Sequence, residues 1–145
     1  MIKQYVADAS VMLKWVVGDE REEDQEKALK FLQEWVSGRT EVSAPDLWQY
    51  EVGNFLGREV PEEAAEKMDL LRNLHIRHVD LSETVYRQCF IWMREDKITF
   101  YDATYLAVAH EIGADLVTAD AKFVKKMKKR GRIFLLKELD FYVKG

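Results

Sequence analysis

The stretch that decides the fold lies at residues 2–17, with the sequence IKQYVADASVMLKWVV. Its first part, residues 2–7, is apolar and β-prone and predicts a buried strand. Residues 9–17 predict a short helix that ends near Gly18. Asp8 stands between the two, at the carboxyl end of the strand. That end of an open α/β sheet is where ligands bind, so Asp8 is the first candidate for a functional side chain.

Two more aspartates and a glutamate have related positions. Asp120 follows the apolar run Leu116–Ala119 and precedes a helical pattern, whereas Asp102 enters its helix from a loop. Glu51 lies on a helix that comes between these strands in the sequence. If the strands are parallel neighbours, the four carboxylates meet and repel one another by roughly 4 kcal/mol per close pair at an effective dielectric near 20. A hard divalent cation would turn this repulsion into binding, which predicts a metal-dependent enzyme that acts on a phosphate.

The remaining pattern predicts alternating strands and helices. Strands are predicted at residues 2–7, 40–44, 76–81, 115–119 and 133–136. Helices are predicted at residues 9–17, 24–36, 46–57, 82–94, 99–112 and 121–130, with a further helix opening at Pro61. Connections of this length require parallel pairing with right-handed crossovers. We therefore expect a three-layer α/β/α domain with a central parallel sheet of about five strands, although spacing alone does not determine the strand order.

Composition limits the class of protein. The formal net charge is −4 and the isoelectric point is near 5.5, so no global basic excess indicates nucleic acid. A nuclease needs only a local basic track. The one cysteine, Cys89, cannot form an intramolecular disulfide, and no apolar run approaches the ~20 residues that cross a membrane. We expect one domain over residues 1–145, no membrane association and a cytoplasmic location.

Each carboxylate also has a purely structural explanation. Asp8 and Asp120 lie where helix N-caps belong, and Thr99–Asp102 resembles a capping box with aspartate in place of glutamate. Glu51 can equally be a surface residue. Taken together, however, this explanation must treat the convergence of several caps at one sheet edge as chance.

Polar neighbours support the functional interpretation. Glu51 and Asn54 stand three residues apart, so both can point to one place from a single helix face. Ser10 and Thr118 each lie two residues from an aspartate, where they can hold a carboxylate or cap a helix. An all-oxygen ligand set favours Mg²⁺ or Mn²⁺.

Other kinds of site find little support. His75 and His78 are predicted to point to opposite faces of a strand-like segment, and no cysteine–histidine cluster fits zinc. The chain has no glycine-rich phosphate loop.

A basic stripe begins just after Asp120. It contains Lys122, Lys125, Lys126, Lys128, Lys129 and Arg130. One interpretation is a solvated helix whose cations lie favourably near its C-terminus. The other is a track for the phosphate backbone of a nucleic acid that leads away from the acidic pocket, with Lys122, Lys125, Lys126 and Lys129 as the binding residues.

These residues together resemble the PIN-domain family, and within it the VapC-type toxins of prokaryotic toxin–antitoxin pairs. The resemblance covers nearly the whole chain. It rests on Asp8-Ala9-Ser10, on Glu51 with Asn54, on residues 101–107 (YDATYLA) and on residues 116–120 (LVTAD). These four pieces occur in the family's order and at approximately its spacing.

The resemblance implies a sheet ordered 3-2-1-4-5 and a ribonuclease that depends on Mg²⁺ or Mn²⁺. Asp8, Glu51 and Asp102 match the three principal acidic positions of the family, and Asp120 matches the fourth. These four would be the catalytic and metal-binding residues, with Ser10, Asn54 and Thr118 as polar support. The resemblance further implies a homodimer and an antitoxin of the VapB kind that occupies the cleft.

Two features of the chain extend or qualify this hypothesis. The helices at 24–36 and 46–57 carry more large apolar residues than a small monomer easily hides, which favours the homodimer. Those residues are Phe31, Leu32, Trp35, Trp48, Phe55 and Leu56. Two alternatives stay open: a non-catalytic PIN-like module that binds RNA or protein, and a receiver or phosphatase of the α/β type. The second usually has another acid near the first aspartate, and this chain has Ala7 and Ser10 beside Asp8.

Overall fold

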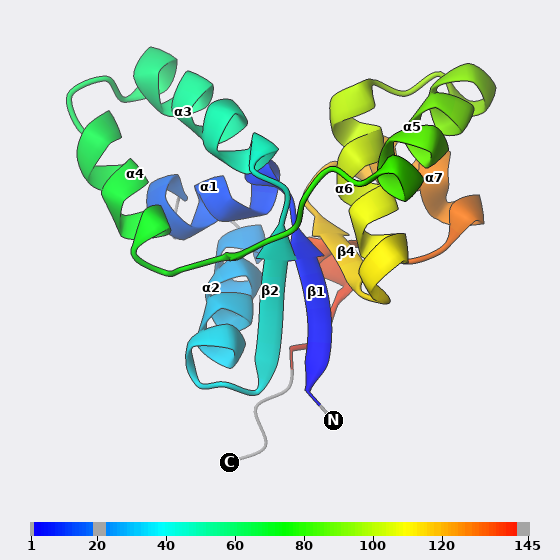
Figure 1. Cartoon of the computed structure of the whole chain (residues 1–145). Helices are drawn as coiled ribbons and strands as arrows, with labels where there is room; N and C mark the ends of the chain where they lie inside the picture. The colour runs from blue at the N-terminus through cyan, green and yellow to red at the C-terminus, as the bar shows by residue number, and fades with distance from the viewer. Residues whose placement is uncertain (1, 19–22, 142–145) are drawn as a thin grey trace.

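The computed structural model describes residues 2–18 and 23–141 (Figure 1). The strands of the described residues are β1 (Lys3–Ala7), β2 (Thr40–Ala44), β3 (Arg77–His78), β4 (Asp115–Thr118) and β5 (Ile133–Leu135). The α-helices are α1 (Ala9–Val17), α2 (Glu23–Val36), α3 (Leu47–Glu59), α4 (Ala64–Arg72), α5 (Glu83–Asp96), α6 (Phe100–Ile112) and α7 (Ala121–Met127). Two short 3-10 helices, η1 (Lys128–Arg130) and η2 (Leu136–Glu138), flank β5.

The five strands form one parallel sheet with the order β3-β2-β1-β4-β5. In the centre, Val6 of β1 pairs with Ser43 on one side and with Leu116 on the other. The parallel sheet and the order 3-2-1-4-5 are both confirmed. Because the strands are parallel, the junctions that follow β1, β2 and β4 all lie at the same edge of the sheet.

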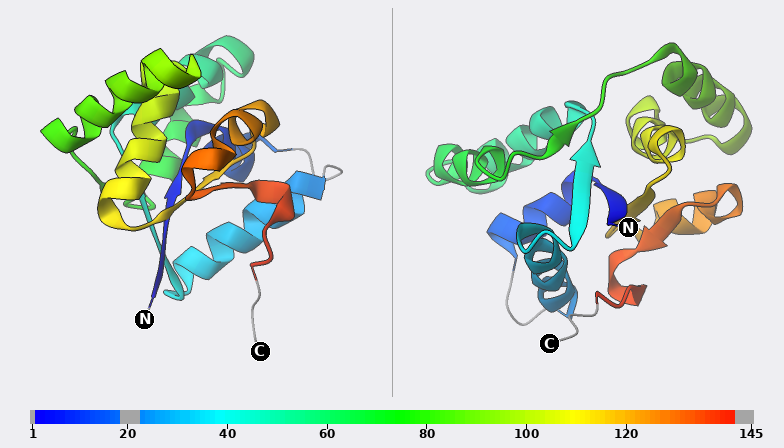
Figure 2. Two further views of the ribbon diagram at one scale, coloured as in Figure 1. Left: turned by 90° about the vertical axis from the view of Figure 1, so that its right-hand side faces the viewer. Right: turned by 60° about the horizontal axis from the view of Figure 1, so that its bottom comes forward.

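Helices cover both faces of the sheet. In the left view of Figure 2 the sheet is seen nearly on edge, with α6 on one side and α2 on the other. Both helices contact the strands of the sheet. Val6, Ala7, Leu116 and Val117 have no exposed surface, which explains why β1 and β4 lack an alternating pattern. The three-layer α/β/α architecture is therefore confirmed.

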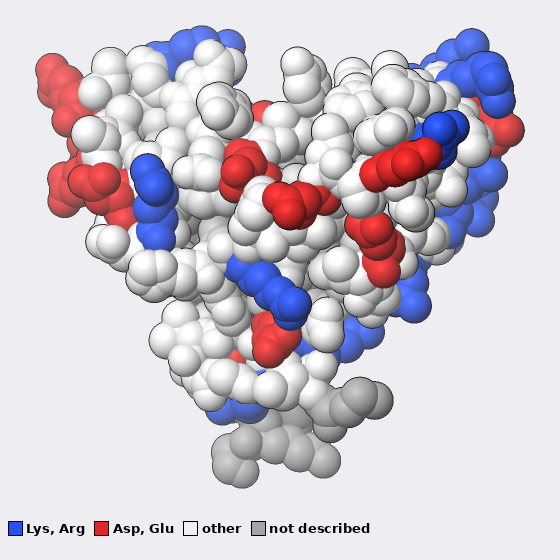
Figure 3. All heavy atoms as spheres, in the orientation of Figure 1, with Lys and Arg blue, Asp and Glu red and all other residues white. Residues whose placement is uncertain are grey.

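The helices beyond the sheet form two arms above the carboxyl ends of the strands. One arm contains α1, α3 and α4, and the other contains α5, α6 and α7 (Figure 1). The space-filling view shows a notch between the arms (Figure 3). The connection from β3 to α5 crosses in front of the sheet and joins the two arms.

Several boundaries differ from those expected. Pro61 does not open a helix, because residues 61–63 form turns and α4 begins at Ala64. The strand expected at residues 76–81 is reduced to the two residues of β3. The basic helix ends at Met127 and continues as η1, which Gly131 ends with a φ of 81° that favours glycine.

The apolar residues that suggested a homodimer face are mostly in the core. Phe31 and Leu56 have no exposed surface and Trp48 is 5% exposed, while Leu32, Trp35 and Phe55 pack partly buried against the core. That argument for a dimer was wrong, because α2 packs against α1, β2 and η2, and α3 packs against α1 and α4. No described helix is long and apolar enough to cross a membrane.

Candidate active site

Asp8 ends β1 and caps α1. Its Oδ1 accepts hydrogen bonds from the backbone N–H of Val11 at 3.3 Å and from the hydroxyl of Ser10 at 2.5 Å. The side chain is buried, and burial raises the pKa of Asp8 to about 6, although the hydroxyls of Ser10 and Thr118 partly oppose the rise. The cap interpretation is therefore correct for this residue, and its carboxylate is also buried.

Ser10 and Thr118 connect the junction after β1 to the junction after β4. The Ser10 hydroxyl accepts from the backbone N–H of Ala119 at 2.9 Å and lies 3.4 Å from the Thr118 hydroxyl. Thr118 in turn accepts from the backbone N–H of Asp120 at 3.1 Å. These hydroxyls hold the two aspartate-bearing turns in a fixed relation.

Asp120 caps α7 from the neighbouring turn. Its Oδ1 accepts from the backbone N–H groups of Lys122 at 3.0 Å and of Phe123 at 3.1 Å. Unlike Asp8, the residue is exposed to solvent. Its second carboxylate oxygen makes no hydrogen bond with the described residues and remains free for another ligand.

Asp102 lies inside the first turn of α6 and is not its cap. Thr99 is the N-cap, and its hydroxyl accepts from the backbone N–H of Asp102 at 3.1 Å. Burial raises the pKa of Asp102 to about 6, with further contributions from the charges of Asp120 and Glu51, while Lys126 acts in the opposite direction. The expected capping box is thus only half formed, and the Asp102 carboxylate is left to face the other acids.

Glu51 reaches the same place from α3. Its Oε1 accepts a 2.7 Å hydrogen bond from the hydroxyl of Tyr105 on α6. Burial, followed by the charge of Glu51, raises the pKa of Tyr105 far above its ordinary value, so the phenol remains a donor. Asn54 lies exposed on the same helix, and its side chain makes no hydrogen bond within the described residues.

The four carboxylates are close enough for their charges to act on one another. Asp102 raises the pKa of Asp8, while Asp120 and Glu51 raise that of Asp102. The residue types fit Mg²⁺ or Mn²⁺, since the candidate ligands carry carboxylate or hydroxyl oxygens. Among the described residues, however, no three acidic, histidine or cysteine side chains are gathered tightly enough to form a ready-made metal cage.

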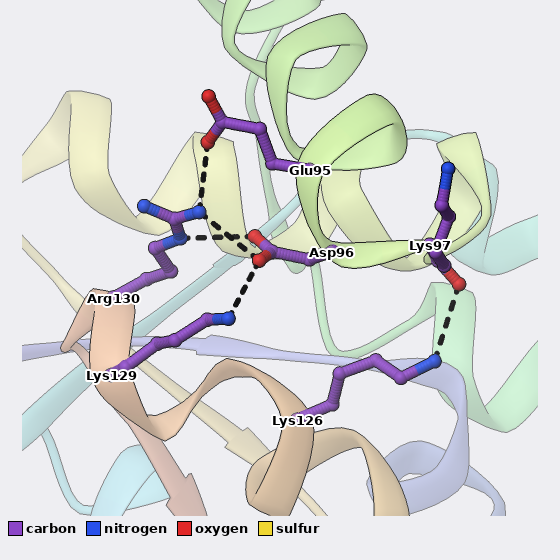
Figure 4. Close-up of polar contacts among 6 residues, drawn as sticks. All are labelled: Glu95, Asp96, Lys97, Lys126, Lys129 and Arg130. Atoms are coloured by element: carbon purple, nitrogen blue, oxygen red, sulfur yellow. Dashed lines mark hydrogen bonds and ion pairs between the residues drawn. The ribbon is translucent and has the colours of Figure 1, made fainter.

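The basic stripe divides into two parts in three dimensions. At its C-terminal end, Arg130 donates two hydrogen bonds to Asp96, at 2.9 and 3.0 Å, and Lys129 forms a 2.9 Å ion pair with the same carboxylate (Figure 4). Arg130 also donates to Glu95 at 2.9 Å. The assignment of Lys129 to RNA therefore conflicts with a contact inside the protein that already uses its charge.

The N-terminal part of the stripe faces the acids. A cavity of about 230 Å³ is lined by Asp102, Asp120, Lys122 and Lys126, among others. The Lys126 ammonium donates to the backbone carbonyl of Lys97 at 3.2 Å, which holds it at the wall of this cavity (Figure 4). We call this space the lysine cavity. Lys125 lies elsewhere, at a second cavity of about 640 Å³ between α7 and β5.

Tyr105 and Asp96 are the residues that sequence reasoning missed. Tyr105 stands three residues after Asp102 on one helix, so the spacing already placed the two on one face. Asp96 lies 33 residues before Lys129 and 34 before Arg130 in the chain, with no local pattern that joins them. A search for side chains three or four residues from each candidate acid would have found Tyr105, but it would not have found the contacts of Asp96.

The comparisons with known proteins agree with this geometry. Residues 5–129 match the PIN domain family. The chain belongs to this family. A relative from Pyrobaculum aerophilum, named Ribonuclease VapC3, is 31% identical over 128 residues, which cover 83% of this chain and 92% of the relative. The resemblance to the PIN domain and VapC proteins is confirmed.

Solved structures support the fold. A toxin–antitoxin complex from Klebsiella pneumoniae contains a chain that superposes with a TM-score of 0.69 at 15% identity, covering 93% of this chain and 99% of that one. VapC20 from Mycobacterium tuberculosis, described as a Sarcin-Ricin loop cleaving toxin, has a TM-score of 0.61 at 20% identity, covering 83% and 93%. At these identities the likeness concerns the fold alone.

Proposed function

We propose that this chain is a metal-dependent endoribonuclease that hydrolyses RNA phosphodiester bonds and acts as the toxin of a toxin–antitoxin pair. The observation that carries the proposal is the set of four acidic residues at the carboxyl edge of a PIN-domain sheet, two of which, Asp8 and Asp102, have pKa values that burial raises to about 6. The 31% identity to a protein named as a ribonuclease supports the same reaction class.

Asp8 and Asp102 would hold the principal cation, and Glu51 and Asp120 would complete that site or hold a second ion. When bound, Mg²⁺ or Mn²⁺ supplies positive charge that activates water and neutralises the phosphate. Ser10 and the N–H of Val11 orient Asp8, and the Tyr105 hydroxyl orients Glu51. Such outer contacts commonly determine how well a site binds its metal.

Lys122 and Lys126 would bind an RNA phosphate beside the acids. Both line the lysine cavity, and Lys122 has no ion-pair partner among the described residues. The RNA would be single-stranded or exposed, because only an open backbone enters such a pocket. Lys125 is less suited to bind this phosphate because it lines the other cavity, between α7 and β5. Lys129 is less suited because it is paired with Asp96.

An antitoxin segment would close the other side of the acid cluster. A cavity of about 390 Å³ adjoins Ser10 and is lined by Leu13, Val17 and Phe55. It fits an apolar anchor, and a cation on the same segment would face Asp8 and Asp102. The toxin–antitoxin complexes among the structural neighbours support such a partner.

A homodimer would use other apolar residues than those first considered. Phe90 and Ile91 on α5 are 57% and 40% exposed. Light scattering at micromolar concentration should show a dimer of the 17.0 kDa chain. A strictly monomeric mass would remove the homodimer while leaving the nuclease and the antitoxin untouched.

The decisive experiment incubates the purified protein with RNA in Mn²⁺, in Mg²⁺ and in chelator. We expect cleavage with metal, none with chelator, and a metal-dependent rise in melting temperature, as for any ligand selective for the folded state. RNA binding without cleavage would instead indicate a non-catalytic module. Hydrolysis of a small phosphate ester, with neither binding nor cleavage of RNA, would indicate a phosphatase-type domain.

A further inference from the structure

We propose that a cavity beside Tyr101 is a nucleobase-binding subsite, which gives the nuclease a base preference next to its cutting site. The inference rests on the proposed function. The cavity has a volume of about 340 Å³ and is lined by residues 45–47, residues 78–81, Phe100, Tyr101 and Thr104. We call it the Tyr101 cavity.

The Tyr101 cavity lies at the same sheet edge as the acids. Its walls include residues that follow β2 and β3, while Asp8 follows β1. The first turn of α6 separates it from the lysine cavity: Phe100 and Tyr101 line one space, and Thr99 and Asp102 line the other. The two cavities therefore lie on either side of one helical turn, so neighbouring parts of one RNA strand can enter both.

Aromatic rings form one wall of the Tyr101 cavity. The Tyr101 ring is 57% exposed and has no ring contact or hydrogen bond with any described residue. Phe100 is held in place by Phe90, with ring centroids 5.5 Å apart. Exposed aromatic side chains are the platforms on which proteins stack unpaired RNA bases.

The rim of the cavity also contains acidic residues, Asp46 and Asp80, which carry hydrogen-bond acceptors. The His78 ring lies between two carboxylates, 2.9 Å from Asp46 and 2.6 Å from Asp80. Acidic side chains also gather in the middle of the face shown in Figure 3, near the β3–α5 connection. Such a rim repels a phosphate, which leaves the uncharged base as the part of RNA that fits.

The rim also predicts which bases bind best. The Oδ1 atoms of Asp46 and Asp80 already contact His78, so their Oδ2 atoms are the ones that can accept hydrogen bonds from the amino groups of cytosine, adenine or guanine. Uracil has no amino group and presents carbonyl oxygens instead. We therefore infer a preference for amino-bearing bases, while the phosphate on the other side of the α6 turn pairs with Lys122 and Lys126.

Binding without catalysis tests the subsite separately from the proposed function. Full-length protein in chelator is titrated with cytidine, adenosine and uridine 5′-monophosphates and with ribose 5-phosphate, and binding is followed by NMR. Cytidine and adenosine nucleotides should bind more tightly than uridine, and ribose 5-phosphate most weakly. Tyr101→Ala should weaken cytidine nucleotide binding by about tenfold, the typical effect of removing one stacking ring.

Tyr50→Ala is the matched control, because Tyr50 is 78% exposed and lines none of the cavities described above. It should bind nucleotides as wild type does. Equal affinity for all four probes in wild type, or unchanged binding in Tyr101→Ala, overturns the proposal. A Tyr101→Ala variant that loses dimer or antitoxin binding while its nucleotide binding is unchanged also overturns it, because the cavity is then a protein interface.

Sequencing of the RNA ends gives the second test. Wild type with Mn²⁺ should cut a randomised RNA beside amino-bearing bases, and Tyr101→Ala should reduce that preference at least threefold. Asp80→Asn should increase cutting beside uracil, since an amide can donate to a carbonyl. Asp80 is almost fully exposed, so this change tests recognition without risk to the fold. Base binding at Tyr101 without cleavage would reject only the ribonuclease function, and cleavage without base preference would reject only the subsite.

Discussion

Asp96 and Asp8 are both buried carboxylates, but their charges meet opposite surroundings. Asp96, 6% exposed, is paired with Arg130 and Lys129, and the hydrogen bond from Arg130 holds its pKa below the ordinary value. Asp8, 8% exposed, has only hydroxyl and N–H partners, and burial raises its pKa to about 6. The fold thus neutralises a buried acid where it serves structure.

The difference shows where the protein lacks positive charge. Asp102, like Asp8, has a pKa raised to about 6, and its first turn of α6 lies near other acids. Lys126 is within reach of Asp102 but is held toward the carbonyl of Lys97. Asp8 and Asp102 form no ion pair with any described residue, in contrast to Asp96, and buried acids without a cation partner support the catalytic proposal over a purely structural role.

The largest expected effect separates the two roles by chemistry. Asparagine caps a helix about as well as aspartate, but it is a poor anionic ligand. Asp8→Asn should therefore fold normally because asparagine keeps the cap, and Asp102→Asn should fold normally because that side chain caps no helix. Both should lose RNA cleavage by more than about a hundredfold, since even outer partners of a metal ligand contribute 10- to 100-fold. Circular dichroism and an RNase assay give the result. Full activity in either variant would disprove the catalytic assignment.

The second effect concerns pH. The folded-state pKa of Asp8 is about 6 against an ordinary 3.8, so the folded protein holds more protons than the unfolded chain between about pH 4 and 6. The free energy of unfolding of metal-free protein should therefore decrease as pH rises through this window, by about 3 kcal/mol from Asp8. Denaturant unfolding of wild type and Asp8→Asn isolates this contribution as their difference.

In the presence of Mn²⁺, cleavage should increase through the same window, because metal ligands must be ionised. A difference between wild type and Asp8→Asn that does not change with pH would contradict the raised pKa. Asp96 offers the opposite case, since its lowered pKa contributes stability that is lost only as the pH falls below its ordinary range.

The third effect compares Asp96 with Asp102 directly. Asp96→Asn should destabilise the protein by about 2 kcal/mol, less than the ~3–5 expected for a fully buried pair, because Lys129 can turn to solvent. Asp102→Asn should melt no lower than wild type in chelator, because it removes a repelling charge. Urea unfolding measures both. A large loss of stability in Asp102→Asn with none in Asp96→Asn would contradict the assignment of Asp96 to structure and Asp102 to catalysis.

The smallest effect separates the two parts of the basic stripe. Lys126→Gln should weaken RNA binding and reduce the slope of log affinity against log salt by about 0.7, the value for one phosphate contact on a single strand. Lys129→Gln is the matched control, and its slope should stay unchanged because Asp96 engages that ammonium. Fluorescence anisotropy in chelator measures both. Equal slopes in the two variants and in wild type would leave α7 as a solvated helix face.

Local sequence determined most of the architecture. The strands at β1 and β4 were visible because apolar runs without alternation mark strands buried on both faces. Long connections required parallel pairing, and parallel pairing placed Asp8 and Asp120 at one edge. The predicted ends of helices were less accurate where turns and helices use the same residue types, as at Pro61 and η1. The strand order came from the family resemblance, because spacing does not choose which strands are neighbours.

Only the tertiary structure decided how the charges of the site are distributed. The hydrogen bond from Tyr105 to Glu51 spans 54 residues, and the contacts of Asp96 with Arg130 span 34. Such contacts depend on how helices cross, and side-chain periodicity describes one helix at a time. The burial of Phe31 and Leu56 has the same cause. The sequence shows that each belongs to an apolar helix stripe, but only the packing of neighbouring helices decides that the stripe is buried within this chain.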